Sequence, residues 1–189
     1  MKSVIMDGTK GKNTIGEVVE ELAQQIKEEI HYFKLEDLDI KPCRNCGGCS
    51  YKTPGQCVFK DDMPQILEVI KKARVCIWVT PITLGGYNSI TKKVIDKLQL
   101  IGIPTMIVYK GRLQHPNSLS GADEGSFISI GIEGETTTEK EKEDFKFLIK
   151  ENGLITCSIG YPFLVKGTED RQEMKETLEK ALSIGGNQK

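Results

Sequence analysis

The sequence of 189 residues lacks the features of several classes of protein. No apolar run approaches the ~18 residues of a transmembrane helix. The N-terminus, MKSVIMDG, lacks the apolar segment and small-residue cleavage site of a signal peptide. The net charge is only −1, which gives no support for nucleic-acid binding or a basic membrane patch. We therefore expect a cytoplasmic protein that binds neither nucleic acid nor membrane.

Histidine is also scarce, because the sequence contains only His31 and His115. We interpret His31, at the start of a predicted strand, as structural. His115 lies in an irregular stretch and has the better claim to a ligand or partner contact. No side chain stands out as a general acid or base, so the sequence assigns no catalytic residue.

Apolar runs alternate with amphipathic helical patterns along the chain, which is typical of an α/β fold with a parallel sheet. The five predicted strands are Ser3–Met6, Ile30–Leu38, Arg74–Thr80, Phe127–Ile132 and Leu154–Ile159. The predicted helices begin near Thr14, Asp61, Ser89 and Thr136, with a last helix over Glu169–Leu182. The helix from Thr136 is expected to end at Asn152-Gly153.

The predicted organisation is a single domain over residues 1–189 with two departures from the strand–helix alternation. The first is a cysteine loop at residues 39–60. The second is the region at about residues 102–124, where Thr105–Tyr109 resembles a strand but no helical periodicity follows. A parallel crossover normally contains a helix. We therefore predict that residues 102–124 form an excursion over the strand ends or into a partner subunit.

Cysteine is concentrated in one place. Four of the six cysteines follow the spacing C-x2-C-x2-C-x7-C, namely Cys43, Cys46, Cys49 and Cys57. In a cytosolic protein, clustered cysteines indicate metal or redox ligands rather than disulfides. The spacing suits a [4Fe–4S] cluster, since three close thiolates can cap one side and a fourth can close it. Zinc and unligated redox thiols remain alternatives. Cys76 and Cys157, each alone in an apolar run, are predicted to pack in the core.

Two loops at predicted strand ends indicate a ligand site. The first, DGTKGKNT, offers backbone amides, hydroxyls and two lysines to a phosphate. The second, PITLGG, leaves amides free where ligands of open α/β sheets bind. A phosphate loop after strand one and an open loop after strand three suit FMN. The candidate FMN-binding residues are Gly8, Thr9, Lys10, Lys12, Asn13, Thr14, Pro81, Ile82, Thr83, Leu84, Gly85 and Gly86. The cysteine loop follows strand two, so we expect it to share this carboxyl edge of the sheet.

Three segments resemble the NADPH-dependent FMN reductases, and among them the iron–sulfur flavoproteins. They are GTKGKNT, CRNCGGCSYKTPGQCVFKDDM and TPITLGGYNSITKKVIDKL, in the order found in that family. The resemblance implies a three-layer αβα flavodoxin-like fold with a five-stranded parallel sheet of order 2-1-3-4-5. It also implies bound FMN, a four-cysteine cluster, and a homodimer or homotetramer in which cluster and flavin lie across a subunit boundary.

The leading hypothesis is a flavoprotein oxidoreductase that passes electrons between a [4Fe–4S] cluster and FMN. Its external partner would be NAD(P)H, a quinone or a ferredoxin-like protein. A second hypothesis is an NAD(P)H-dependent FMN or quinone reductase without a cluster. A third, of a different class, is a non-enzymatic binding module whose cysteine loop holds zinc.

Overall fold

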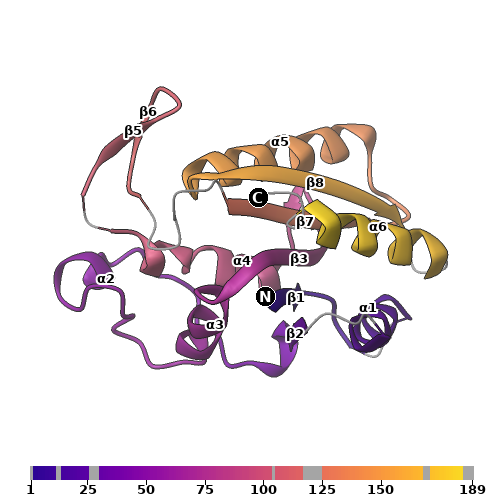
Figure 1. The fold of residues 1–189 in the computed structure, drawn as a ribbon, viewed down its shortest axis with the longest axis horizontal. Coiled ribbons are helices and arrows are strands. Elements are labelled where there is room, and N and C mark those ends of the chain that lie inside the picture. The colour runs from indigo at the N-terminus through magenta and orange to yellow at the C-terminus, as the bar shows by residue number, and fades with distance from the viewer. Residues whose placement is uncertain are drawn as a thin grey trace.

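The computed structural model describes residues 2–11, 14–25, 30–103, 105–116, 125–167 and 171–184. Its central sheet contains five parallel strands in the order β2-β1-β3-β7-β8 (Figure 1). These strands are β1 (Lys2–Asp7), β2 (Ile30–Lys34), β3 (Ala73–Thr83), β7 (Gly125–Glu133) and β8 (Ser158–Lys166). Counted along the chain, this is the predicted flavodoxin-like order 2-1-3-4-5, which is confirmed.

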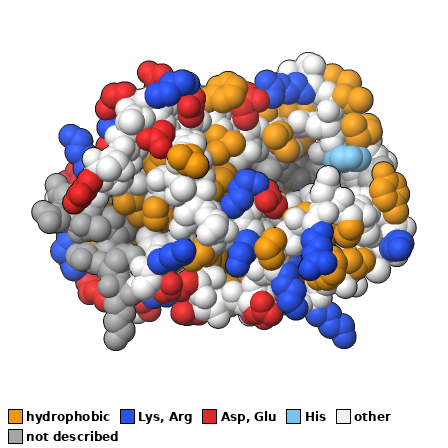
Figure 2. Space-filling model, turned by 180° about the vertical axis from the view of Figure 1, so that it is seen from behind, with side chains coloured by type: hydrophobic (Ala, Val, Ile, Leu, Met, Phe, Trp, Pro, Cys, Tyr) orange, Lys and Arg blue, Asp and Glu red, His pale blue; other side chains and the backbone are white. Residues whose placement is uncertain are grey.

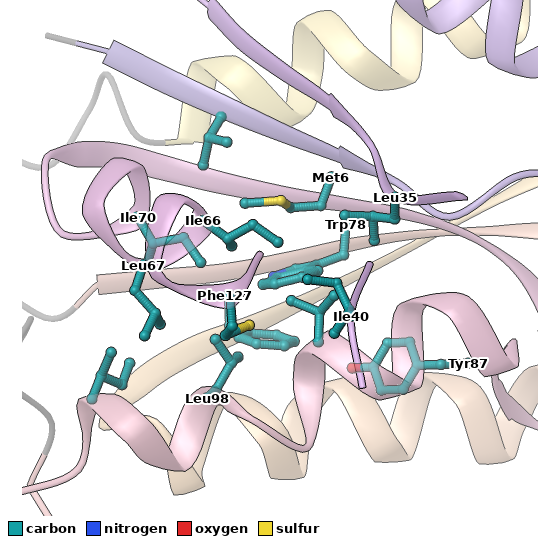
Figure 3. Close-up of a cluster of buried hydrophobic side chains, with 14 of the residues drawn as sticks. Met6, Leu35, Ile40, Ile66, Leu67, Ile70, Trp78, Tyr87, Leu98 and Phe127 are labelled. Carbon is teal, nitrogen blue, oxygen red and sulfur yellow. The ribbon is translucent and has the colours of Figure 1, made fainter. Parts of the chain in front are cut away.

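Helices cover both faces of the sheet, because each buried strand is apolar on both sides. On one face lie α1 (Thr14–Gln25) and α6 (Arg171–Ile184), packed on Ile5, Ile77 and Ile128. The other face carries α3 (Met63–Ile70), α4 (Ser89–Ile95) and α5 (Glu139–Ile155). In the core of this second face, the Trp78 and Phe127 rings stack with centroids 5.9 Å apart (Figure 3).

Short elements complete the described chain. They are the 3₁₀ helices η1 (Leu35–Asp37) and η2 (Leu98–Ile101), helix α2 (Gly48–Tyr51), and strands β4 (Gly86–Tyr87), β5 (Ile107–Tyr109) and β6 (Arg112–Gln114). No helix among the described residues is long and apolar enough to cross a membrane.

The strand-like segment Thr105–Tyr109 forms part of a separate hairpin, in which β5 pairs antiparallel with β6. This hairpin stands apart from the central sheet in Figure 1. Its base is closed by His115, whose Nδ1 lies 2.8 Å from the carbonyl oxygen of Thr105 and 3.1 Å from that of Ile103. His115 therefore has a structural contact.

The predicted fifth strand, Leu154–Ile159, is wrong in its position. Helix α5 continues through Asn152-Gly153 to Ile155, and the strand begins only at Ser158. Gly153 packs directly on β8, and a Cβ atom there would lie 2.2 Å from the backbone nitrogen of Gly160. The glycine thus permits close helix–strand contact instead of ending the helix. Cys157 lies in the turn before β8, where it is buried and accepts a hydrogen bond from Gln114 Nε2.

Candidate functional site

The first predicted loop leaves β1 beside β3. Asp7 pairs with Val79 in the sheet, and the Gly8 backbone N–H donates to the Val79 carbonyl oxygen at 2.8 Å. Thr9 is buried, and its hydroxyl has no hydrogen-bond partner among the described residues. Lys10 is exposed at the surface of the loop. Helix α1 begins at Thr14, whereas the predicted site residues Lys12 and Asn13 lie outside the described residues.

Asp7 is fully buried at the start of this loop. Its Oδ1 accepts the Thr9 backbone N–H at 2.8 Å, and its Oδ2 accepts the Tyr32 hydroxyl at 2.6 Å. Burial, followed by this hydrogen bond, raises the pKa of Tyr32. The hydroxyl therefore stays protonated and holds the carboxylate inside the turn.

A second carboxylate lies at the outer part of the loop. Both oxygens of Glu36 accept the Gly11 backbone N–H, at 2.9 and 2.8 Å. Lys34 pairs with Glu36 at 3.0 Å and donates to the Gly11 carbonyl oxygen at 3.3 Å. The hydrogen bond from Gly11, then that from Lys34, lowers the pKa of Glu36. The Glu36 carboxylate thus accepts a backbone N–H of the loop, and backbone N–H groups of such loops commonly bind phosphate.

The second predicted loop is a tight hairpin. β3 and β4 pair antiparallel at Ile82 with Tyr87 and at Thr83 with Gly86, leaving Leu84 and Gly85 as a two-residue turn. Both have positive φ, 50° and 72°, as a type I′ turn requires. Gly85 faces α5, where a Cβ would lie 2.9 Å from that of Asp144. Leu84 points outward, and its side chain is 91% exposed. Its positive φ is unusual for a leucine.

Asn88 joins the two loops, and the sequence pattern, which predicted the start of this helix near Ser89, did not single it out. Its Oδ1 accepts the Thr91 backbone N–H at 3.0 Å, so Asn88 is the N-cap of α4. Its Nδ2 donates to the Gly8 carbonyl oxygen. A Cβ at Gly8 would lie 1.9 Å from Thr91 Oγ1. The Asn-Ser order leaves either residue as a possible cap, and the hydrogen bond from the Thr91 backbone N–H to the Asn88 side chain decides between them.

The four clustered cysteines line one hollow. Its lining comes from the cysteine loop (residues 39–60), hereafter the cysteine segment, with Val58 and Phe59 beside the thiols. The rest comes from Lys97, which follows α4, and from Gln99 and Leu100 in η2. The segment turns at Gly47, whose φ is 68°, and Arg44 lies over the Phe59 ring at 4.8 Å. Among the described residues, no three His, Cys, Asp or Glu side chains lie close enough together to hold one metal ion.

The base of the cysteine segment is fastened by the acidic pair that precedes α3. The Asp62 carboxylate accepts the Asp39 backbone N–H at 2.8 Å, and Asp61 accepts that of Lys41 at 3.0 Å. Asp61 also forms an ion pair with Lys97. Burial alone would raise the pKa of Asp61, but hydrogen bonds from Lys97 and from the backbone of Lys41 and Met63 hold it below its usual value.

The expectation that the cysteine loop shares the carboxyl edge with the two candidate FMN loops is wrong. The hollow is lined by no described residue of either loop. In Figure 1 the β3 and β8 arrowheads point to the right of the view, whereas α2 lies at the left. Asp39 and Lys41 bind the residues before α3, and this contact carries the chain along the helical face, away from that edge.

Basic and apolar side chains surround the cysteine site. Lys41, Arg44, Lys52 and Lys60 are exposed, and the sequence from Lys41 to Lys60 contains no acidic residue. Figure 2 shows basic and apolar side chains gathered at the lower right, the side of α2 in that turned view. Cys76 lies apart from this site in β3, and burial raises the pKa of its thiol to about 12.

Residues 1–126 match the family of NADPH-dependent FMN reductases. This match covers more than half of the sequence. The chain belongs to that family.

Its curated relatives include two iron–sulfur flavoproteins. One, from Archaeoglobus fulgidus, is 29% identical over 53% of this chain and 50% of its own length. The other, from Methanocaldococcus jannaschii, is 28% identical over 79% of this chain and 72% of its own length. The match to the Archaeoglobus protein thus spans about half of that relative.

Several solved structures share the fold of this chain. One is an NAD(P)H:quinone oxidoreductase from Methanothermobacter marburgensis, with TM-score 0.65, 13% identity and coverage of 99% of this chain and 98% of its own. Another is an FMN-dependent NADH-azoreductase from Bacillus anthracis in complex with FMN, with TM-score 0.59, 16% identity and 98% coverage of both chains. At these identities the likeness establishes the fold alone.

Proposed function

We propose that this protein is a flavoprotein oxidoreductase that passes electrons between a [4Fe–4S] cluster at Cys43, Cys46, Cys49 and Cys57 and FMN held by the β1 and β3 loops. The observation that carries the proposal is that these four cysteines line one hollow. Family membership supports FMN as the partner cofactor.

The spacing of the cysteines favours a cluster over a single zinc ion, because three successive thiols two residues apart and a distal fourth fit paired zinc knuckles poorly. A zinc ion draws all four of its sulfur ligands to about 2.3 Å from one point. A cubane takes its four thiolates at separate corners. All four thiols line one hollow, as a shared site requires. The basic surroundings also suit a thiolate-rich site.

The FMN site draws on both loops at the carboxyl edge. The unpartnered Thr9 hydroxyl and the Lys10 ammonium group would bind the phosphate, together with Lys12, Asn13 and Thr14. Pro81, Ile82, Thr83, Leu84 and Gly86 would contact the ring system, and Gly85 allows that turn to pack on α5. FMN, when bound, supplies the exchange of one or two electrons. NAD(P)H, a quinone or a ferredoxin-like protein would be the external partner.

Anaerobic purification tests this proposal. The protein should be brown, release FMN on acid treatment, and contain about four iron and four sulfide per chain. The variant Cys46→Ser should lose iron and sulfide but keep FMN. Cys76→Ala is the matched control, because this half-buried cysteine in β3 lies outside the hollow, and it should keep both cofactors. Colourless protein that contains zinc would overturn the proposal.

The second candidate is an NAD(P)H-dependent quinone reductase without a cluster. The observation that favours it is the full-length fold match to an NAD(P)H:quinone oxidoreductase. Yellow protein with FMN and quinone reduction by NAD(P)H, but no acid-labile sulfide after anaerobic purification, would select this candidate. In that case Cys46→Ser should leave quinone reduction unchanged.

A further inference from the structure

Gln99 contacts the cysteine site from outside the cysteine segment. Its side-chain Nε2 donates a hydrogen bond to Cys43 Sγ, with a nitrogen–sulfur distance of 3.0 Å. The backbone N–H of Asn45 donates to the same sulfur at 3.5 Å. Of these two donors, only Gln99 comes from a different part of the chain, the 3₁₀ helix η2. Its amide can be removed without altering the segment that carries the thiols.

Gln99 is held in position by the segment that precedes it. Two residues earlier, Lys97 is buried and paired with Asp61, and Leu100 packs in the core next to Gln99. The backbone N–H of Leu100 also donates to the Lys97 carbonyl oxygen at 3.0 Å. These contacts fix the backbone on both sides of Gln99, although its side chain lies at the surface.

We propose that Gln99 sets the reduction potential of the iron–sulfur cluster through its hydrogen bond to the Cys43 sulfur. This inference rests on the proposed function. Reduction adds one electron, and the added negative charge is shared with the thiolate ligands. An N–H donor to a ligand sulfur stabilises the more negative, reduced form more than the oxidised form. The donor therefore raises the potential, and its removal lowers it. Gln99 acts through Cys43.

The test is a redox titration of the anaerobically purified or reconstituted holoprotein with dithionite as reductant, followed by the electron paramagnetic resonance signal of the reduced cluster. In Gln99→Leu, the ratio of reduced to oxidised cluster at a fixed potential should fall about tenfold. For a one-electron couple this is a shift of about 59 mV to more negative potential. Gln99→Glu retains the side-chain shape but places a carboxylate near the sulfur, so its shift should be larger in the same direction.

The matched control is Gln65→Leu, which changes an exposed glutamine on α3 that does not line the hollow. Its titration curve should coincide with that of the wild type. An unchanged potential in both Gln99 variants, with iron and sulfide equal to wild type, overturns the inference and leaves the proposed function standing. Absence of iron and sulfide from the wild-type protein overturns the proposed function, and the inference with it. Should Gln99→Leu fail to load the cluster, Gln99→Glu carries the measurement.

Discussion

Lys97 and Asp61 form an ion pair beneath the cysteine site, with 2% of the lysine side chain and none of the aspartate side chain exposed. The pair joins the end of α4 to the base of the cysteine segment, because Asp61 also accepts the backbone N–H of Lys41. A buried pair of this kind is costly to break from one side, since the remaining charge loses its partner.

Replacing Lys97 with methionine should lower the free energy of unfolding by about 3 kcal/mol, because Asp61 would be left as an uncompensated buried carboxylate. Urea denaturation measures this loss. Lys92→Met is the control: Lys92, in α4, pairs with Asp96 at the surface, and its loss should cost no more than about 0.5 kcal/mol. In the double variant Asp61→Asn/Lys97→Met, much of the stability should return. If the losses in free energy of unfolding from the two single substitutions simply added in the double variant, Asp61 and Lys97 would not be coupled.

The Asp61 carboxyl group should also make the free energy of unfolding depend on pH. The pKa of Asp61 in the folded protein lies below its usual value, so its ionised form contributes stability above the unfolded-state pKa of about 4. This contribution disappears as the pH falls through the folded-state pKa. The stability gap between wild type and Asp61→Asn should therefore be widest at neutral pH and shrink below pH ~4. Urea midpoints measured from pH 7 to pH 3 test this, and a constant gap would refute it.

Glu36 should weaken the binding of FMN. Its carboxylate accepts the Gly11 backbone N–H and places a negative charge beside the loop proposed to bind the FMN phosphate. In Glu36→Gln the negative charge is gone and Lys34 loses its ionic partner, so FMN affinity should rise a few-fold. Quenching of flavin fluorescence on titration into the apoprotein measures the affinity. Glu68→Gln removes an exposed carboxylate on α3, paired with Lys72, and should leave it unchanged.

Leu84 should show opposite effects on stability and on FMN binding. In Leu84→Gly the left-handed backbone conformation is no longer strained, and after the entropy cost of glycine the gain should be about 0.5 kcal/mol. The exposed side chain is also lost, so FMN should bind less tightly. Leu113→Gly, at an exposed strand position, should lose stability and leave FMN binding unchanged. Equal FMN affinity in wild type and Leu84→Gly would remove Leu84 from the site.

Gly153 should tolerate no side chain. In Gly153→Ala the added methyl group would meet the backbone of Gly160 at 2.2 Å, so α5 must shift from β8 at a cost of about 2–3 kcal/mol. Gly134→Ala is the matched control, since a Cβ there makes only ordinary contact with Thr137, at 3.6 Å. Thermal unfolding distinguishes the two. Equal melting temperatures would show that the helix–strand contact is loose.

Sequence patterns predicted the sheet well, because a strand that is buried on both faces has a continuous apolar sequence, as β3 does. They predicted the end of α5 badly. Glycine marks helix ends and also close packing, and the sequence alone cannot say which of these Gly153 serves.

The candidate sites also contain features that the sequence predicted and features that it did not. The spacing of the cysteines indicated one joint site, and the structure places all four around one hollow. Its location could not be predicted, because it depends on contacts such as that between Asp39 and Asp62, which connect residues on either side of the loop. Gln99 and Lys97 gave no local signal at all. A glutamine and a lysine near the end of an amphipathic helix look like ordinary surface residues.

The segment from Asn88 to Gln99 contacts the β1 loop at its first residue and the Cys43 sulfur at its last. Its α-helical part, Ser89–Ile95, spans on the order of 10 Å at about 1.5 Å per residue, and a turn and η2 continue it to Gln99. The segment therefore connects the candidate FMN loop and the candidate cluster site of one chain through these two contacts. Electron exchange within a chain would have a rate constant independent of protein concentration. Exchange between associated copies would slow on dilution, so a dilution series of single-turnover measurements distinguishes the two routes.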